Sequence, residues 1–418
     1  MISADEARGF VLHRLTALAP VDLALSEVVG CVSAGFVTAQ EPSPSFANSA
    51  MDGFALRSSD TASGQARLRV IDSIFAGDPS SVRVGKGEAA HIMTGAPMPD
   101  GADSVCMREE ATVESDGTHV AIHRAVEVGE SVRNAGEDVA TGETLVEPGD
   151  VIGPALLGLL TSQGIRSVSV HPRPRVGVLS TGNELRDGAN PLGPGAIRDS
   201  NRPTLLASLR QSDFSPVDLG IVRDTHAAIR EAFERGIHEC DAVISTGGVS
   251  VGDADYVKSV LADLFGDEAR SMQVAIKPGR PFAYAYAEST STPFFGLAGN
   301  PISTLVGFEL FVRPALRVLA GHRDIERPTF PMVLDCALPR RRDGKLHLVH
   351  GVCQIHDDGH LHVERVARRG DRLLNAVAEA NCLVFVPDGD GLHPGDSVRA
   401  MVLDANRLNG AASHFGRA

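Results

Sequence analysis

The residues best suited to chemistry lie in the glycine-rich segment Ser245-Thr-Gly-Gly-Val-Ser-Val-Gly-Asp-Ala-Asp255, between a short apolar run and a helical pattern. Its three glycines permit positive φ and close approach, so backbone N–H groups can converge on an anion. The N-terminus of the following helix adds favourable charge. The segment predicts a phosphate site; the alternative is an ordinary strand-to-helix turn capped by Asp253 or Asp255. Neither the P-loop pattern nor the dinucleotide-binding glycine pattern occurs in the chain.

Acidic side chains follow three of the predicted strands. Glu184 ends the run Thr181-Gly-Asn-Glu184, Asp224 follows Arg223, and Asp255 closes the glycine-rich segment. Carboxyl ends of parallel strands meet at one edge of a sheet, so we expect these carboxylates to share a crevice. Carboxylates that face phosphates need a divalent cation between them, which favours Mg²⁺. Each acid alone is explained as well by a helix cap or a solvated loop; their shared position indicates the site.

Two cations and a hydroxyl form a third candidate group. The turn Ala275-Ile-Lys-Pro-Gly-Arg-Pro281 presents Lys277 and Arg280, and Gly299-Asn-Pro-Ile-Ser303 opens the next helix. Fixed cations, a hydroxyl and free helix N–H groups suit a tetrahedral oxyanion. The alternative is a surface turn with solvated charges and a capping serine.

Other polar groupings carry weaker signals. Ser49-Ala-Met-Asp-Gly53 and Met93-Thr-Gly-Ala96 are typical of tight turns. Five histidines fall between positions 347 and 362, and alternation places His360 and His362 on one strand face, where a metal site is conceivable. Hairpin faces often carry scattered histidines, and no Cys or carboxylate cluster completes a ligand set, so we favour the surface interpretation.

The elements that must position these residues form several domains. Strands and helices alternate from position 175 to 320, which predicts a parallel sheet with helices on both faces, and the flanking segments have β patterns. We expect a central doubly wound α/β domain, a helical and extended linker domain, an inserted small β domain and a C-terminal β-barrel-like domain. The predicted boundaries are 1–48 and 141–171 (linker), 49–140 (small β), 172–322 (α/β), 323–406 (C-terminal β) and 407–418 (flexible tail).

Composition excludes several classes of protein. The 418 residues carry a net charge of −14, which opposes binding to nucleic acid or to a membrane surface. The longest apolar stretch, 151–160, is half of what a bilayer span needs, and the N-terminus lacks a signal-peptide pattern. Six cysteines without a C-x-x-C pair indicate reduced, mostly buried thiols rather than a zinc ribbon or disulfide framework. We therefore expect a cytoplasmic protein.

Taken together, these segments resemble the molybdopterin molybdenumtransferase family, of the MoeA and gephyrin E-domain type, over nearly the whole chain. The matching motifs, in family order, are Ser49–Phe54, Ile92–Ala96, Gly136–Asp138, Ser180–Leu185, Arg198–Asn201, Ser245–Tyr256, Ala275–Pro281 and Gly299–Ser303. The resemblance implies Mg²⁺-dependent insertion of molybdate into adenylylated molybdopterin, with release of AMP.

The resemblance also implies roles for individual residues. The catalytic set would be Asp52, Thr94, Asp138, Glu184, Asp224 and Asp255, with Asp224 and Asp255 holding Mg²⁺. Phosphate and pterin would lie against Ser245, Thr246, Gly247, Gly248, Ser250, Gly252 and Asn201, and molybdate against Lys277, Arg280 and Ser303. The family is dimeric, so one subunit's small β domain would face the other's α/β domain. A molybdopterin adenylyltransferase and molybdoenzymes are the implied protein partners.

Four positions depart from the family pattern. Gln273 replaces a usual Lys or Arg, His350 a usual Arg, and Asp371 and Asn375 replace common serines. These substitutions weaken the expected oxyanion contact from the C-terminal domain. They motivate a second hypothesis, a catalytically weak paralogue that carries molybdopterin or serves as a scaffold. A third is a nucleotide pyrophosphatase that hydrolyses adenylylated substrates without molybdate.

Overall fold

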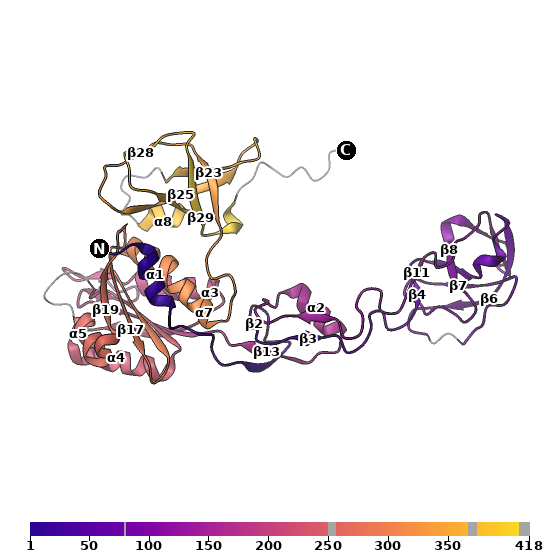
Figure 1. Cartoon of the computed structure of the whole chain (residues 1–418), viewed down its shortest axis with the longest axis horizontal. Coiled ribbons are helices and arrows are strands. Elements are labelled where there is room, and N and C mark those ends of the chain that lie inside the picture. The colour runs from indigo at the N-terminus through magenta and orange to yellow at the C-terminus, as the bar shows by residue number, and fades with distance from the viewer. Residues whose placement is uncertain (79–80, 250–255, 367–373, 409–418) are drawn as a thin grey trace.

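The computed structural model describes residues 1–78, 81–249, 256–366 and 374–408. Figure 1 shows an elongated molecule in which an α/β part and a C-terminal β part lie together at one end. A narrow middle part leads from them to a small β part at the opposite end. The expected fold class, a multidomain α/β and β protein, is confirmed. No helix among the described residues is both long and apolar enough to cross a membrane.

The central sheet has six strands in the order β17-β14-β18-β22-β21-β19. Their bounds are β14 Arg175–Thr181, β17 Ser215–Val222, β18 Ala242–Thr246, β19 Arg270–Gln273, β21 Pro281–Ala287 and β22 Thr292–Leu297. The first four strands in sheet order are parallel to one another. The fifth strand, β21, is antiparallel to both of its neighbours, β22 and β19. The expectation of a wholly parallel sheet was therefore wrong. Only four residues join β21 to β22, too few for the crossover that a parallel pair needs.

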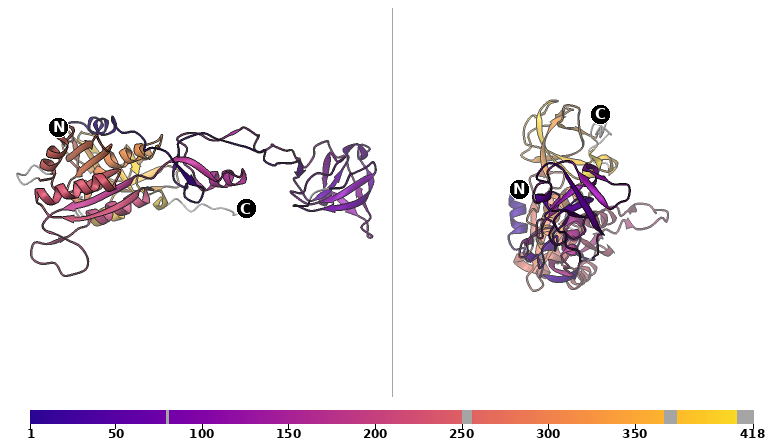
Figure 2. Two further views of the ribbon diagram at one scale, coloured as in Figure 1. Left: turned by 90° about the horizontal axis from the view of Figure 1, so that it is seen from below. Right: turned by 90° about the vertical axis from the view of Figure 1, so that its right-hand side faces the viewer.

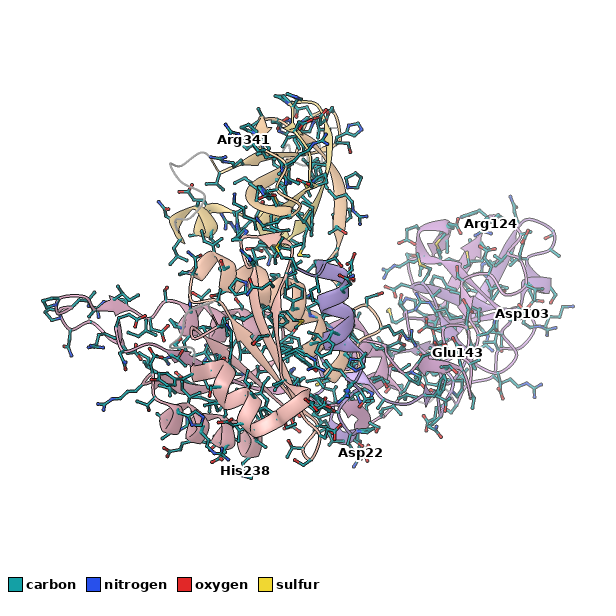
Figure 3. All side chains as sticks on the ribbon, turned by 60° about the vertical axis from the view of Figure 1, so that its left-hand side comes forward. Asp22, Asp103, Arg124, Glu143, His238 and Arg341 are labelled. Atoms are coloured by element: carbon teal, nitrogen blue, oxygen red, sulfur yellow. The ribbon has the colours of Figure 1, made fainter. Side chains whose placement is uncertain are left out.

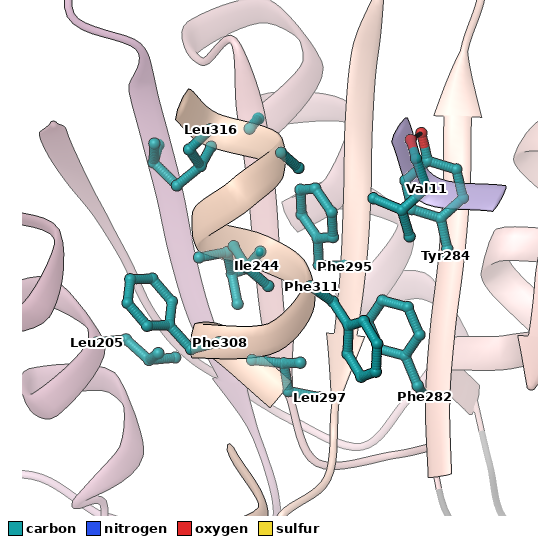
Figure 4. Close-up of a cluster of buried hydrophobic side chains, with 14 of the residues drawn as sticks. Val11, Leu205, Ile244, Phe282, Tyr284, Phe295, Leu297, Phe308, Phe311 and Leu316 are labelled. Atoms are coloured by element: carbon teal, nitrogen blue, oxygen red, sulfur yellow. Dashed lines mark hydrogen bonds between the residues drawn. The ribbon is translucent and has the colours of Figure 1, made fainter. Parts of the chain in front are cut away.

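Helices cover both faces of this sheet, as the left panel of Figure 2 shows. Their bounds are α3 Asn201–Gln211, α4 His226–Glu239, α5 Tyr256–Phe265, α6 Pro301–Gly307 and α7 Arg313–Leu319, with a π-helical turn at Phe308–Val312 between the last two. One core joins α3, α7 and the π-helical turn to the sheet, and Figure 4 shows Phe308 and Phe311 within it. A second core packs α4 and α5 on the other face through Phe233 and Val257.

The N-terminal helix α1 (Ala4–Leu12) packs on this α/β part rather than on the middle of the molecule. Ser3 and Glu6 form a capping box that fixes its start. Ala7 and Val11 are fully buried in the first core, and the hydroxyl of Tyr284 donates to the carbonyl of Val11 at 3.2 Å. The first residues of the chain thus help to hold the sheet that carries the candidate site.

The middle part is built from two stretches of chain, one leading outward and one returning. Its elements are β1 Val21–Ala24, β2 Val32–Ser33, β3 Val37–Thr38, β12 Thr144–Val146, α2 Pro154–Ser162 and β13 Ser167–His171. β13 pairs antiparallel with β1 and β2, and β12 pairs with β3. Val28, Ile152 and Leu160 form a small core between the two stretches. Both stretches are therefore needed to form this part.

The small β part lies at the far end (Figures 1 and 2). Its sheet has the order β8-β5-β7-β6-β10-β9. The bounds are β5 Gly53–Leu56, β6 Ala66–Ile74, β7 Glu88–Ile92, β8 Ser104–Met107, β9 Ala111–Val113 and β10 His119–Ile122. At its entry, β4 (Asn48–Ser49) pairs with β11 (Val132–Arg133). Short 3-10 turns lie at Ser58–Asp60 and Arg108–Glu110.

Gly53 determines how closely β5 approaches β8. A Cβ at this position would lie 2.0 Å from the carbonyl oxygen of Cys106, so no larger residue fits without separating the strands. We expect Gly53→Ala to destabilise the small β part by about 1–3 kcal/mol, through overpacking and lost strand pairing. Calorimetry checks this as a lower Tm; the control is Gly35→Ala in the middle part, because a Cβ on Gly35 would meet no atom within 4 Å and its φ is outside the left-handed region. An unchanged Tm for Gly53→Ala would contradict the close approach.

The C-terminal part is a closed barrel. Its strands are β23 Thr329–Leu334, β25 Leu346–Ile355, β26 Leu361–Arg365, β27 Cys382–Val386 and β29 Ser397–Val402. The order β25-β26-β23-β29-β27 closes through pairing of β27 with β25. β20 (Ile276–Lys277), which belongs to the α/β segment of the chain, adds to β25 and joins the two parts. The remaining elements are β15 Leu185–Arg186, β16 Ile197–Arg198, β24 Leu338–Pro339, β28 Gly391–Leu392, α8 Leu374–Glu379 and 3-10 turns at Gly266–Glu268 and Ala405–Arg407.

The cysteines lie as the sequence predicts. All six are free thiols, and every one except Cys336 is buried.

Candidate active site

A cavity of about 540 Å³ opens at the carboxyl ends of β14 and β18, where an open α/β sheet binds its ligands. The predicted residues that line it are Glu184, Asn201, Asp224, Thr246, Gly247, Gly248 and Ser303. They come from turns that are far apart in the sequence, and the parallel strands bring these turns to one edge. The shared crevice inferred from strand ends is therefore present in the structure.

The glycine turn approaches β14 closely. Gly247 and Gly248 have φ of +90° and +64°, and a Cβ on Gly247 would lie 2.6 Å from the carbonyl oxygen of Thr181. The N–H of Gly247 donates to the carbonyl of Leu297 at 3.1 Å, so this N–H is committed within the protein. The Gly247 N–H is therefore not among the backbone N–H groups of this turn that can converge on an anion. Ser250, Gly252, Asp253 and Asp255 lie outside the described residues.

Two buried polar atoms beside the cavity lack partners among the described residues. Asn201 donates its amide to the carbonyl of Gly299 at 2.9 Å, but its Oδ1 atom accepts no hydrogen bond. The hydroxyl of Ser245 is also buried without a partner; Ser245 itself does not line the cavity, but the adjacent Thr246 does. An unsatisfied buried polar group costs about 1–3 kcal/mol, so such atoms mark where a ligand completes the hydrogen bonding. Asn201 therefore offers an acceptor to a donor group on that ligand.

Two carboxylates share this cavity. Glu184 and Asp224 both line it, and the backbone N–H of Asn183 donates to Asp224 at 3.3 Å. Burial raises the pKa of Asp224, and the neighbouring charge of Glu184 raises it further, against the lowering effect of the Asn183 hydrogen bond. A divalent cation between the two would relieve both the burial cost and the repulsion. Carboxylate oxygens are ligands that Mg²⁺ prefers, so the residues present fit this ion.

A buried ion network positions Asn201, and sequence reasoning did not identify it. The Arg202 guanidinium, at 6% exposure, pairs with Asp199, Asp187 and Asp218. Asp199 also accepts from the hydroxyl of Ser180 at 3.0 Å, which ties the start of α3 to β14. The i, i+3 spacing of Asp199 and Arg202 was the only local signal, because Asp187 and Asp218 lie 15 and 16 residues from Arg202 in the sequence.

A second cavity, of about 670 Å³, lies between the α/β part and the barrel. Lys277 lines it on one side, and Arg340, Arg341 and His350 line it on the other; Figure 3 labels Arg341 on the barrel. Asn300 and Ser303 line both cavities, so the two adjoin. The Lys277 ammonium makes no hydrogen bond or ion pair with any described residue. It is therefore available to an oxyanion.

The helix start beside Lys277 differs from expectation. The Asn300 side chain caps α6 by accepting from the N–H groups of Ile302 at 3.1 Å and Ser303 at 3.3 Å. These N–H groups are thus not free for an oxyanion, and the side chain of Ser303 is the contact that remains. Arg280 is exposed and is not among the residues that line either cavity. Of the three predicted oxyanion residues, the structure brings Lys277 and Ser303 together.

The positions that depart from the family pattern lie in different surroundings. His350 lines the second cavity, and burial lowers its pKa to about 4, so the side chain is neutral at pH 7. It therefore does not replace the positive charge of an arginine. Asn375 is exposed in α8, Gln273 ends β19, and Asp371 lies outside the described residues.

The half-buried His350 predicts a pH-dependent stability. Its folded pKa, about 4, is below the ordinary value of 6.5, so protonation favours the unfolded chain. This stabilisation is complete above pH 6.5 and is lost as pH falls from 6.5 to about 4, by up to about 3 kcal/mol. We expect Tm measured over this range to fall less steeply for His350→Gln than for the wild type. The exposed His360→Gln is the control, and parallel curves for all three would contradict the assignment.

Three predicted catalytic residues lie in or beside the small β part. The carboxylate of Asp52 accepts from the N–H and the hydroxyl of Thr94, both at 2.7 Å, and these bonds lower its pKa. The motifs Ser49–Gly53 and Met93–Ala96 do form turns, and the N–H of Gly95 joins them by donating to the carbonyl of Ser49 at 2.8 Å. Asp138 lines a separate cavity of about 450 Å³ with Arg133. The small β part, whose strands β5 and β7 adjoin Asp52 and Thr94, lies at the opposite end of the molecule from the α/β part (Figures 1 and 2).

Comparison with known proteins identifies the family that has this order of domains. Three family models match successive parts of the chain: the MoeA N-terminal region, domains I and II, at 2–164; a probable molybdopterin binding domain at 177–318; and the MoeA C-terminal region, domain IV, at 335–403. A molybdopterin molybdenumtransferase from Haemophilus influenzae is 35% identical over 392 residues, covering 94% of this chain and 96% of the relative. The chain belongs to the molybdopterin molybdenumtransferase family.

Further relatives of this family agree along the whole chain. The molybdopterin molybdenumtransferase of Bacillus subtilis is 33% identical over 416 residues, covering 96% of this chain and 94% of the relative. The crystal structure of the molybdopterin biosynthesis moeA protein from Pyrococcus horikoshii OT3 superposes with a TM-score of 0.80 at 26% identity, covering 96% of this chain and all of that one. As a molybdopterin molybdenumtransferase family member, the chain is an enzyme of molybdenum cofactor biosynthesis.

Proposed function

We propose that this protein inserts molybdate into adenylylated molybdopterin with Mg²⁺ and releases AMP. The observation that carries the proposal is the pair of adjoining cavities. One has carboxylates and unsatisfied buried polar atoms, and the other has an unpaired cation, Lys277, among the described residues. A phosphorylated pterin with a metal ion suits the first cavity, and an oxyanion suits the second.

Residues of the first cavity bind and orient the substrate in this proposal. Ser245, Thr246 and the turn at Gly247 and Gly248 hold the phosphate and pterin, and Asn201 accepts a hydrogen bond from the ligand. Glu184 and Asp224, with Asp255, hold Mg²⁺, which when bound supplies positive charge to the phosphates. Ser250 and Gly252 extend the phosphate contact. Positioning and charge neutralisation at phosphorus are what this chain's residues contribute.

Residues at the junction hold molybdate. Lys277 lines the second cavity and Ser303 lines both, so together they place the oxyanion next to the pterin. Arg280, on the same turn, adds long-range positive charge rather than a contact.

A second subunit completes the site in this proposal. The small β part and the α/β part of one chain lie at opposite ends of the molecule, so a homodimer in which the small β part of one subunit faces the α/β part of the other would supply Asp52, Thr94 and Asp138. The lowered pKa of Asp52 keeps it ionised for this role. A molybdopterin adenylyltransferase and molybdoenzymes in the cytoplasm are the partners that would deliver substrate and accept product.

The proposal is tested by AMP release from adenylylated molybdopterin with Mg²⁺, with and without molybdate, together with molybdenum retained as cofactor. We expect AMP release to depend on both Mg²⁺ and molybdate. AMP release that is indifferent to molybdate would instead identify a pyrophosphatase.

One observation favours a second candidate function, a weakly catalytic carrier of molybdopterin. His350 is neutral at pH 7, so position 350 does not supply the charge that an arginine there would add to Arg340 and Arg341 on the barrel side of the cavity. If this loss limits the enzyme, His350→Arg will lower the KM for molybdate by about tenfold, since one added charge contact is worth about 1.5–3 kcal/mol. The assay is molybdate-dependent AMP release across molybdate concentrations, with His360→Arg as a control on the exposed hairpin. A fully active wild type that His350→Arg does not improve would exclude the carrier.

A further inference from the structure

Three side chains converge on the outer surface of the barrel, outside both cavities. Asp335 follows β23, His356 follows β25 and His362 lies in β26. Each offers one ligand atom, and these atoms lie within 4.8 Å of one another. It is the one such group of His, Cys, Asp or Glu found in the part of the chain that the structure describes.

The backbone fixes the positions of all three residues. The N–H of Asp335 donates to the carbonyl of Val363 at 2.9 Å, beside the parallel pairing of β23 with β26. The N–H of His356 donates to the carbonyl of His360 at 3.0 Å and closes the β25–β26 hairpin. The three side chains thus project from paired strand ends, not from independent loops.

The side chains are arranged as a ligand set. The imidazoles of His356 and His362 stack with their centroids 3.9 Å apart and their planes 6° apart. Nδ1 of His362 lies 2.7 Å from Oδ1 of Asp335, and Nε2 of His356 lies 3.9 Å from Oδ2 of the same carboxylate. Two ring nitrogens therefore face the two oxygens of one acid.

A second carboxylate orients His362. Nε2 of this ring lies 3.0 Å from Oδ2 of Asp358, on the side away from Asp335. A histidine that binds a metal through one nitrogen donates its other N–H to a carboxylate in this way, which fixes the tautomer and the ring plane.

We propose that Asp335, His356 and His362 bind a borderline divalent cation such as Zn²⁺, with Asp358 as the positioning residue. Two imidazole nitrogens and one carboxylate oxygen are a zinc ligand set, whereas Mg²⁺ takes oxygen ligands, so this site is distinct from the one in the α/β cavity. Tetrahedral bonds of about 2.0–2.1 Å place ligand atoms about 3.3 Å apart. The separations of 2.7 and 3.9 Å between the ring nitrogens and the Asp335 oxygens bracket that value, and ligation requires the two stacked rings to turn so that both nitrogens point at one ion. Water completes the coordination.

The site is tested by titrating the metal-free full-length protein with Zn²⁺ in excess Mg²⁺ and molybdate, followed by calorimetry. We expect one equivalent bound with a dissociation constant below about 10 μM, and a raised Tm, because the ion ties three strand ends together. His356→Gln should weaken binding at least about tenfold. Its matched control is His360→Gln, which changes a histidine of the same hairpin whose side chain is 70% exposed and which lies outside the ligand set.

The Asp358→Asn variant and a visible spectrum with Co²⁺ provide two further tests of the metal site. Asp358→Asn removes no ligand but should weaken Zn²⁺ binding by about 10- to 100-fold, as loss of an orienting carboxylate does. Co²⁺ as a spectroscopic probe should give visible d–d bands without the thiolate charge-transfer band that a cysteine site shows. Equal Zn²⁺ affinity in the wild type, His356→Gln and Asp358→Asn proteins, or a thiolate band, would overturn the proposal. Circular dichroism of each metal-free variant verifies that it is folded.

Discussion

Lys277→Ala is expected to lower molybdate-dependent turnover by at least about 100-fold while leaving the affinity for adenylylated molybdopterin unchanged. The ammonium lines the oxyanion cavity and has no partner among the described side chains, so its charge is fully available to the anion. Loss of one positive group that stabilises the charge developing in the transition state raises the activation free energy by about 2.7–4 kcal/mol. The measurement is AMP release and molybdenum incorporation across molybdate concentrations, with substrate binding measured separately.

The control for this prediction is Lys86→Ala, which removes an exposed lysine from the small β part. It matches the change in net charge without touching either cavity. An unaltered KM for molybdate in Lys277→Ala would show that the oxyanion binds elsewhere. Lys277→Arg should retain part of the activity, because the charge stays but the planar guanidinium places it differently.

Mixed dimers of two inactive variants are expected to regain about a quarter of wild-type activity. Asp52→Asn disables the small β contribution, and Lys277→Ala disables the cavity. If each site takes its cavity from one subunit and its small β part from the other, a mixed dimer has one intact site and one doubly substituted site. Random mixing makes half of the dimers mixed, which gives about one intact site in four. The measurement is turnover after co-expression with two affinity tags.

A matched mixture shows whether the recovery has this origin. Glu184→Gln and Lys277→Ala both lie in the α/β part, so no combination of these chains contains an intact cavity, and we expect no recovery. Recovery in this control mixture, or its absence in the Asp52→Asn mixture, would contradict a site shared between subunits. Size-exclusion chromatography of each mixture verifies that dimers form.

Local patterns predicted most of the elements. Strands and helices do alternate between positions 175 and 320, and the segment after position 323 forms strands, because apolar periodicity marks such elements directly. The antiparallel strand β21 was missed, since its burial on both faces hides the alternation that identifies a strand. The packing of α1 against the sheet was not foreseen either, because an amphipathic helix does not specify which apolar surface it covers.

Sequence reasoning likewise predicted some features of the candidate site and not others. Strand-end positions were enough to place Glu184 and Asp224 in one cavity, because parallel topology brings strand ends together. The capping of α6 by Asn300, the committed N–H of Gly247 and the neutrality of His350 depend on contacts across the fold. Likewise, Asp335 is distant in sequence from His356 and His362, and the missing carboxylate of that cluster could be found only in three dimensions.

The pairing of β4 with β11 has a consequence for how such a chain can be built. Asn48 lies opposite Arg133 and Ser49 opposite Val132, so the chain enters and leaves the small β part through neighbouring residues. Residues paired across antiparallel strands are only about 5 Å apart, which a two-residue turn can span. Residues 50–131 therefore form an exchangeable unit. They can be removed and residues 49 and 132 joined by a short turn, or they can be replaced by another domain, without shifting the register of any strand in the remaining chain.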